Sequence, residues 1–206
     1  MSIVKLNNRG VRSATTFGSI TGLGSMVFIK KQTASSSSTI SFVDGTSDVV
    51  LDNTYKEYLF TFNNIHPATD NADFTFNMSV DSGSNYNVTK TTTVATAQHS
   101  EAGSDTGIFY VTADDLAQST AFQIVLGLIG NDADQSASGS LTLFNPSSTT
   151  FVKHFIATGN SYYSGNYSLN DYVAGYGNTT SAVDAVQFKM SSGNIDAGDI
   201  CLYGIN

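Results

Sequence analysis

The stretch YLFTFNNIHPATDNADFTFNMSV, residues 58–80, decides the fold because it contains two apolar alternations of period two. In its second half, large apolar side chains alternate with smaller polar ones over Phe74, Thr75, Phe76, Asn77, Met78, Ser79 and Val80. Tyr58, Phe60 and Phe62 repeat this pattern in the first half. A period of two places one set of side chains on a buried face and the other in water. The stretch therefore predicts two strands that pair or face each other.

Working outward, further short apolar segments alternate with turn-forming clusters at the spacing typical of a sandwich. Strands are expected at residues 26–31, 39–42, 86–92, 122–128, 139–144, 151–158, 185–190 and 199–205. Residues 111–121 are the best helix candidate, with Thr112 as N-cap and Asp115 completing an acidic variant of a capping box. We expect an all-β chain: an antiparallel β-sandwich of jelly-roll type with an extended N-terminal arm and at most one short helix.

The domain organisation expected from the 206 residues is one sandwich domain over residues 26–206, because no Pro-rich or charged linker divides the chain. Residues 1–25 lack sustained periodicity and are broken by Gly10, Gly18, Gly22 and Gly24. They are expected to form an arm that becomes ordered against a partner.

Charge is distributed unevenly along the chain. Residues 1–43 hold five basic residues and no acid, whereas the remainder holds four lysines and 17 acids. The arm residues Lys5, Arg9 and Arg12 are therefore candidates for docking on an acidic neighbouring subunit. The alternative is that these charges only solvate a flexible terminus. Nucleic-acid binding is disfavoured because the cations are sparse and the remainder is acidic.

Cysteine content and hydropathy bear on where the protein is made and used. The single cysteine, Cys201, cannot close an intrachain disulfide and suits a small buried position. Neither a signal-peptide pattern nor an apolar run of membrane-spanning length is found in the sequence. We expect a protein that is made and used without signal-peptide export or membrane insertion.

Residues suited to catalysis are scarce, so the chain is not expected to be an enzyme and no cofactor is expected. His66 and His154 fit turn and strand positions, and His99-Ser100-Glu101 could form a relay only if neighbouring strand residues shared a face. Three clusters could in principle bind calcium, although loop aspartates more often cap turns. They are Asp44, Asp48 and Asp52; Asp70, Asn71 and Asp73; and Asn131, Asp132 and Asp134.

A tyrosine-rich segment at residues 161–176 is the candidate contact loop, with Tyr162, Tyr163, Tyr167 and Tyr172 as its contact residues. Tyr, Ser, Gly and Asn form the composition that binding loops use for rigid aromatic contacts and adaptable hydrogen bonds. A plain surface loop is the alternative. If the segment binds, its expected partner is a glycan or a protein.

Several runs of the chain resemble a group of small virion proteins of marine tailed phages, especially cyanophages. They are KLNNRGV (5–11), TASSSSTISF (33–42), YLFTFNNIHPATDNADFTFN (58–77), DSGSNYNVTKTTT (81–93), GNDADQSASGSLTLFNPSSTTFVKHF (130–155) and FKMSSGNIDAGDICLYGI (188–205). Members are described as virion structural or tail-fibre-like proteins. The resemblance implies a particle component, a jelly-roll-like sandwich and symmetric copies, and it brings no catalytic residues.

The leading functional expectation is a surface-exposed virion protein associated with the tail, as a fibre or fibre adaptor, that assembles through its N-terminal arm. Its expected partners are copies of itself, for example in a trimer, and other virion proteins. Two alternatives stay open: a capsid decoration or cement protein, and a carbohydrate-binding module for attachment to host surface glycans.

Overall fold

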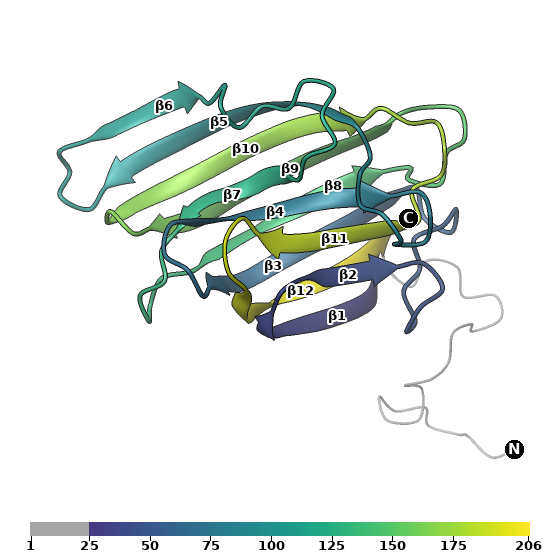
Figure 1. The fold of residues 1–206 in the computed structure, drawn as a ribbon, viewed down its shortest axis with the longest axis horizontal. Coiled ribbons are helices and arrows are strands. Elements are labelled where there is room, and N and C mark those ends of the chain that lie inside the picture. Colours follow the sequence, from purple (N-terminus) through teal and green to yellow (C-terminus); the bar gives the residue numbers. More distant parts are fainter. Residues whose placement is uncertain (1–24) are drawn as a thin grey trace, which may run out of the picture.

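The computed structural model describes residues 25–206, which form twelve strands (Figure 1). The expected arm lies outside the described residues except for Ser25, and so do Lys5, Arg9 and Arg12. The strands are β1 (Met26–Ser37), β2 (Ile40–Val43), β3 (Glu57–Pro67), β4 (Ala72–Ser79), β5 (Lys90–Ser100), β6 (Thr106–Tyr110), β7 (Gln123–Ile129), β8 (Ala137–Phe144), β9 (Lys153–Tyr163), β10 (Tyr167–Gly177), β11 (Ala185–Met190) and β12 (Ile195–Ile205).

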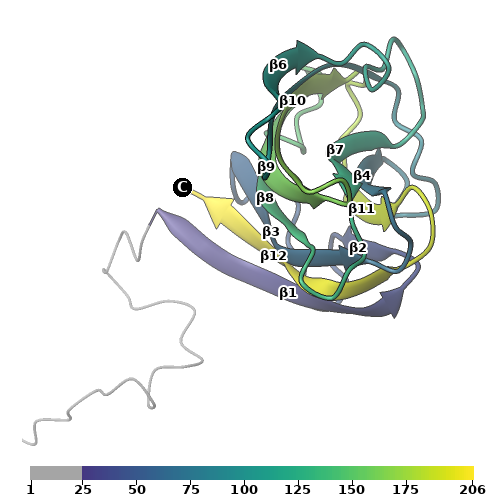
Figure 2. The same cartoon turned by 90° about the vertical axis from the view of Figure 1, so that its left-hand side faces the viewer.

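Eight of these strands form a jelly roll, which confirms the expected all-β antiparallel fold. One sheet has the order β1-β12-β3-β8 and the other has the order β2-β11-β4-β7. This is the strand order of a jelly roll, in which two Greek keys are wound into two facing sheets. Figure 2 shows the two sheets on opposite sides of the core.

Two inserted hairpins enlarge the first sheet. β5 and β6 lie between β4 and β7 in the chain, and β9 and β10 lie between β8 and β11. β9 pairs with β8, β10 with β9, β5 with β10 and β6 with β5, so the sheet continues across four more strands. This extension curves over toward β7 (Figure 2), where Ile129 and Tyr163 form a single bridge between β7 and β9.

The core is built around the alternating apolar residues of the stretch 58–80. The two strands of residues 58–80 belong to facing sheets, and the rings of Phe62 and Phe74 meet with centroids 5.1 Å apart. Phe188 of β11 lies at the centre of this aromatic cluster and is fully buried. Its ring lies 5.2 to 6.4 Å from the rings of Phe42, Phe60, Phe62, Phe74 and Phe76.

The expected helix at residues 111–121 is wrong, since this segment forms turns and irregular backbone and no helix occurs within residues 25–206. Several of its polar groups pair with β5. The carboxylate of Asp115 accepts the N–H of Val94 at 2.8 Å, and the Leu116 N–H donates to Thr92 Oγ1 at 2.7 Å. Ser119 also forms two backbone hydrogen bonds with Lys90. Cross-segment bonds of this kind outcompete the local bonds that a short helix would make.

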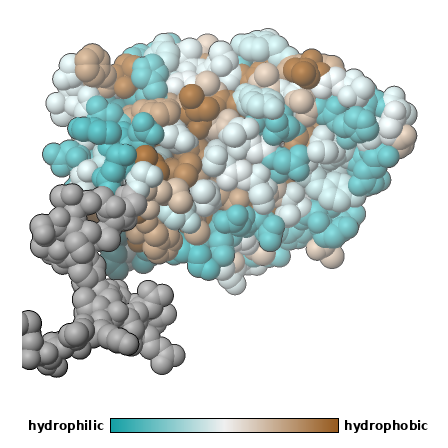
Figure 3. All heavy atoms as spheres, turned by 180° about the vertical axis from the view of Figure 1, so that it is seen from behind, coloured by the Kyte–Doolittle hydropathy of each residue, from teal (hydrophilic) through white to brown (hydrophobic). Residues whose placement is uncertain are grey.

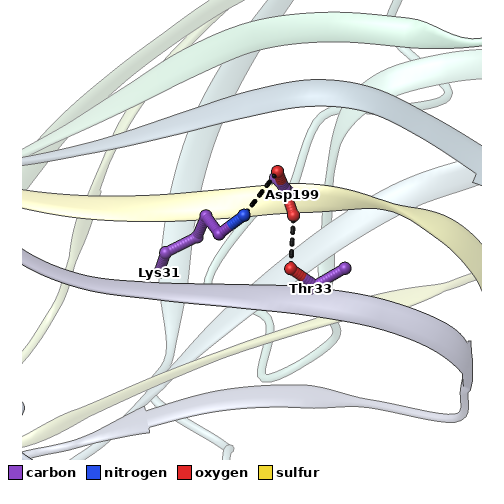
Figure 4. A network of polar contacts seen from close by, with 3 residues as sticks. All are labelled: Lys31, Thr33 and Asp199. Carbon is purple, nitrogen blue, oxygen red and sulfur yellow. Dashed lines mark hydrogen bonds and ion pairs between the residues drawn. The ribbon is translucent and has the colours of Figure 1, made fainter.

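The edge strand β1 is attached to β12 by backbone pairing and by a side-chain network on the outside of the sheet (Figure 4). The Lys31 ammonium lies 3.0 Å from Asp199, whose other carboxylate oxygen accepts a hydrogen bond from Thr33. These hydrogen bonds, led by that of Thr33, lower the pKa of Asp199. The pair Lys31–Asp199 is the one ion pair found in the described part of the chain.

Within residues 25–206, the structure contains no helical segment with the length and apolarity needed to cross a membrane.

Candidate interaction surfaces

The outward side of the extended sheet has an unusual distribution of polarity. We call the outward side chains of β5, β6, β8, β9 and β10 the outer face. All of its positions are described, and none of them is Asp, Glu, Lys or Arg. The three charged residues of these strands, Lys90, Lys153 and Asp171, point inward and are buried. Charged residues are normally exposed and large apolar ones buried, so this sheet reverses the usual arrangement.

Large apolar side chains stand on the outer face in neighbouring strands. Ile108 is 80% exposed, Tyr110 59%, Ile156 54% and Tyr172 52%. Tyr172 is the cross-strand partner of Thr158 on β9 and of Ala95 on β5, which in turn is opposite Tyr110. Figure 3 looks onto this side of the molecule and shows brown apolar residues between white residues of intermediate hydropathy.

Three shallow hollows on the outer face form one groove because they share lining residues. A hollow of 600 Å³ around Tyr172 shares Ile156 and Ala174 with a second hollow of 440 Å³. The second shares Phe144 and His154 with a third of 480 Å³, which reaches Phe151. Contiguous, uncharged and largely apolar surface regions are common at sites where proteins contact other molecules.

The four predicted contact tyrosines do not lie in one loop, because residues 161–176 belong mostly to the β9–β10 hairpin. The expected contact loop is therefore wrong as a loop: only residues 164–166 form the turn. Alternation along the strands places Tyr162 and Tyr172 on the outer face and Tyr163 and Tyr167 on the opposite side. The rings of Tyr163 and Tyr167 lie 5.7 Å apart.

The tip of this hairpin carries a small polar hollow of 270 Å³. Tyr162 and Tyr167 line it together with His99, Glu101 and Asn160. The Tyr167 hydroxyl donates to Asp105 at 3.2 Å, which raises the pKa of this tyrosine. The structure thus brings two of the four tyrosines to one site, next to polar groups able to form hydrogen bonds.

The strongest concentration of titratable groups lies on the inner side of the extension, in a cavity of 340 Å³ that we call the acidic cavity. Its carboxylates come from the start of β4 (Asp73), the loop after β6 (Asp114) and the middle of β10 (Asp171). Phe109, Leu128, Tyr163 and Leu169 supply apolar walls. No Lys, Arg or His is among the lining residues, all of which are described.

A β-bulge in β7 positions two of these carboxylates. The register between β4 and β7 shifts around Phe74, and Leu128 adopts a left-handed backbone with φ 54°. The bulge aims two successive amides at the cavity, since the Gly127 N–H donates to Asp171 at 2.8 Å and the Leu128 N–H donates to Asp73 at 2.9 Å. Bulges next to functional sites commonly re-aim groups in this way.

The electrostatics of the acidic cavity are unfavourable for negative charge. Burial raises the pKa of Asp171, although hydrogen bonds from Gly127 and Thr96 oppose the shift. Burial also raises the pKa of Asp114, and the nearby charges of Asp73 and Asp171 add to this effect. The carboxylates repel one another with no cationic side chain between them.

Several other residues considered from the sequence form local hydrogen bonds instead of a catalytic relay or a metal site. His99 points outward and Ser100 inward, where its hydroxyl accepts the amides of Ser104 and Asp105, so the hypothetical relay is not assembled. Loop aspartates cap turns: Asp44 accepts the N–H of Leu51, and Asp52 that of Thr54. Among the described residues, no group of three or more His, Cys, Asp or Glu side chains could hold a metal ion.

The acidic cavity was missed from the sequence because its three aspartates come from separate segments. One signal was present: Asp171 occupies an inward position between Leu169 and Val173, where an acid is not expected in a strand.

No protein-family model, no curated protein and no solved structure matches this chain. The fold and its surfaces define the class, an all-β jelly roll with an apolar outer face and an acidic cavity.

Proposed function

We propose that this chain is a structural component of a phage virion that lies on the particle surface, is associated with the tail and assembles in several copies. The outer face carries this proposal. An outer face without charge and with four large apolar side chains at least half exposed is poorly suited to permanent contact with water. On a chain with a net charge of −8, it also offers a region where copies approach without like-charge repulsion.

The fold supports the proposal by analogy. Jelly rolls recur in viral capsid proteins and in lectins, although a fold by itself does not determine function. The resemblance of the sequence to virion proteins of marine tailed phages points in the same direction. Neither catalysis nor a cofactor is part of the proposal.

Quantitative mass spectrometry of purified virions tests the location. A tail-associated protein should be present in few copies per particle relative to the major capsid protein. A copy number close to that of the capsid protein would instead favour the decoration or cement role. Absence of the chain from purified particles would refute the proposal.

Charge placed on the outer face tests the assembly surface. Ile156→Lys puts an ammonium group into the shared part of the groove, and the exposed side chain leaves the core unchanged. In sedimentation velocity we expect the natural chain to run as an oligomer and Ile156→Lys to run as a smaller species. Thr46→Lys, at an exposed turn after β2, adds the same charge elsewhere and should leave the oligomer intact. An Ile156→Lys oligomer as stable as that of Thr46→Lys would contradict this role of the outer face.

A second candidate function, glycan recognition, is favoured by the hollow at the hairpin tip. The aromatic ring of Tyr162, next to Asn160 and Glu101, combines an apolar surface with hydrogen-bonding groups. A glycan array probed with and without calcium should give binding that the Tyr162→Ala, Tyr167→Ala double variant loses. No binding under either condition would exclude this candidate.

A further inference from the structure

The extended sheet ends at β6, a strand that is paired on one side only. β6 pairs with β5, and no strand of residues 25–206 lies beyond it (Figure 1). An edge strand presents a row of unpaired backbone N–H and C=O groups, which can pair with a strand of another chain. The open edge of β6 is therefore a candidate site for the addition of a strand.

The hydrogen bonds of the β5–β6 hairpin show which backbone groups point to this open edge. In an antiparallel pair, residues bonded to the neighbouring strand alternate with residues that are not. The Ser100 N–H donates to the Asp105 carbonyl at 2.9 Å, so Gly107 and Phe109 also bond to β5. The other residues of β6 direct their backbone groups away from β5, where residues 25–206 supply no partner. They are Thr106, Ile108 and Tyr110.

The opposite edge of the same sheet is protected against pairing, whereas the edge of β6 is not. Proteins commonly shield edge strands with lysines, prolines or β-bulges. β1 carries Lys30 and Lys31, and its register with β12 shifts between Phe28 and Lys30. β6 has the sequence TGIFY, without charge or proline, and it pairs with β5 without a register shift. Of these two edges, that of β6 is the one suited to pairing.

Large apolar side chains are exposed on both sides of β6. Ile108 and Tyr110, which are 80% and 59% exposed, lie on the outer face, and Phe109, 48% exposed, lies on the inner side. Aromatic and β-branched residues favour strands and are stabilised by contacts with side chains on a neighbouring strand. An added strand would bury part of this apolar surface.

The sequence of β6 is complementary to itself in one antiparallel register. When Ile108 pairs with Ile108 of a second copy, Thr106 lies opposite Tyr110 of that copy. All three open-edge residues of each copy then form hydrogen-bonded pairs, with two bonds in each pair. On the inner side, Phe109 lies opposite Gly107 of the second copy, an arrangement in which an aromatic ring covers the bare backbone of a glycine.

Charge also favours a second copy as the occupant of this edge. The chain has a net charge of −8, so most approaches between copies bring like charges together. β6 has no charged residue, and the outer face beside it has none either. A two-fold axis perpendicular to the sheet keeps the outer faces of both copies on the same side, so the pairing creates one continuous apolar surface.

We propose that β6 pairs with β6 of a second copy in an antiparallel, two-fold arrangement that joins two extended sheets into one. This inference rests on the proposed assembly function and identifies the edge through which two copies meet. Because each copy uses the same strand, the interface is closed and gives a dimer instead of an open fibre. The protected β1 strands lie at the two ends of the joined sheet.

Amide hydrogen exchange of the full chain, measured by NMR alongside sedimentation velocity, tests the pairing. The amides of Gly107 and Phe109 are bonded to β5 and should exchange slowly in monomer and dimer alike. The amides of Thr106, Ile108 and Tyr110 should exchange fast in the monomer and about tenfold or more slowly in the dimer. Protection of these three amides in a chain that sediments as a monomer would assign the edge to another segment of the same chain. That result, or fast exchange at every concentration, would overturn the proposal.

A proline at Ile108 removes the open-edge N–H without removing a hydrogen bond to β5. Proline is tolerated where the missing N–H faces outward from an edge strand. Each dimer of Ile108→Pro loses two hydrogen bonds, so its dissociation constant should rise about tenfold or more. Ile108→Thr is the matched control, because it keeps the N–H and a β-branched side chain. The dissociation constant of this control should stay within about threefold of that of the natural chain.

The exchange rate of the Phe109 amide shows whether β6 stays on β5 in both variants. If Ile108→Pro releases β6 from β5, the exchange pattern of the natural chain decides the question. With β6 in place, equal dissociation constants for Ile108→Pro and Ile108→Thr would overturn the proposal, because side chains would then hold the copies together.

The outcomes are distinct from those that bear on the proposed function. Ile156→Lys tests the groove at β9, and β10 and β5 lie between that strand and β6. The copy number in purified virions tests the virion role and is measured independently of the β6 edge.

Discussion

The buried amine of Lys90 should make stability depend on pH in a way that Lys90→Met removes. Lys90 is fully buried, and its Nζ donates to Asn77 Oδ1 at 2.6 Å and to the Val88 carbonyl at 2.8 Å. Burial lowers the pKa of Lys90 to about 7. A neutral amine has two N–H groups, which matches the two acceptors. In the unfolded chain the same group stays protonated up to about pH 10.4.

The sign of the effect follows from proton binding. Because the lysine pKa is lower in the folded state, the unfolded state binds more protons between about pH 7 and 10.4, so the free energy of unfolding rises with pH in this window. The limiting slope is about 1.4 kcal/mol per pH unit. Integrated from pH 7 to pH 9, Lys90 should add about 2 kcal/mol to stability.

Urea unfolding at pH 7, 8 and 9 measures this contribution. Lys90→Met keeps an unbranched apolar stem and removes the titrating group, so the difference in unfolding free energy should move by about 2 kcal/mol in favour of the natural chain as pH rises. Lys56→Met removes an exposed lysine and should give a constant difference. If the curves for the natural chain and Lys90→Met stay parallel from pH 7 to 9, the reasoning is wrong.

Three further substitutions probe the core, a close strand contact and the acidic cavity. Phe188→Ala should lower the free energy of unfolding in urea by about 3–5 kcal/mol, because it empties the centre of the aromatic cluster. Phe151→Ala, at a site 69% exposed, should change this free energy by no more than about 0.5 kcal/mol. Similar values for the two variants would contradict this picture. Gly159→Ala should destabilise the protein by about 1–3 kcal/mol. The added Cβ would lie 2.7 Å from the Ser138 carbonyl oxygen and 2.9 Å from Gly139 Cα. An unchanged melting temperature would show that β8 and β9 can separate at this position. Asp114→Asn should raise the melting temperature at pH 7, because an aspartate whose pKa is raised on folding opposes folding once it is ionised. The gain in melting temperature should vanish at a pH below the unfolded-state pKa of about 3.9. An equal gain at pH 7 and below this pKa would exclude charge as the cause.

The fold was predictable where one face of a strand meets the core and the other meets solvent. The alternation at residues 58–62 became part of β3, and Ala185–Met190 became β11 with the expected bounds. The alternation at residues 74–80 became β4, but its expected wet face is wrong. Thr75, Asn77 and Ser79 are buried, and Val80 lies beyond the strand and is exposed. The prediction failed at β10 because its Tyr, Ser, Gly and Asn residues suggested a loop, although Leu169, Asp171 and Val173 keep a period of two. Both faces of this strand carry polar groups, so composition hid the periodicity.

The candidate sites were less predictable because they depend on which strands become neighbours. The outer face arises from side chains of five strands, and its lack of charge is visible only once the inward and outward positions are known. The helix expected at residues 111–121 failed for the same reason. The hydroxyl of Thr92 and the backbone of Lys90, distant in sequence, supply the hydrogen bonds that hold this segment in another conformation.

The position of the inserted hairpins suggests a use of the molecule as a display scaffold. Both hairpins leave and re-enter the eight-stranded jelly roll at single connections, while the aromatic cluster lies wholly between the two original sheets. The turn at residues 164–166 is therefore a place where a foreign peptide could be grafted while the fold is maintained by distant contacts. If copies assemble through the outer face, such grafts would be presented as a regular array.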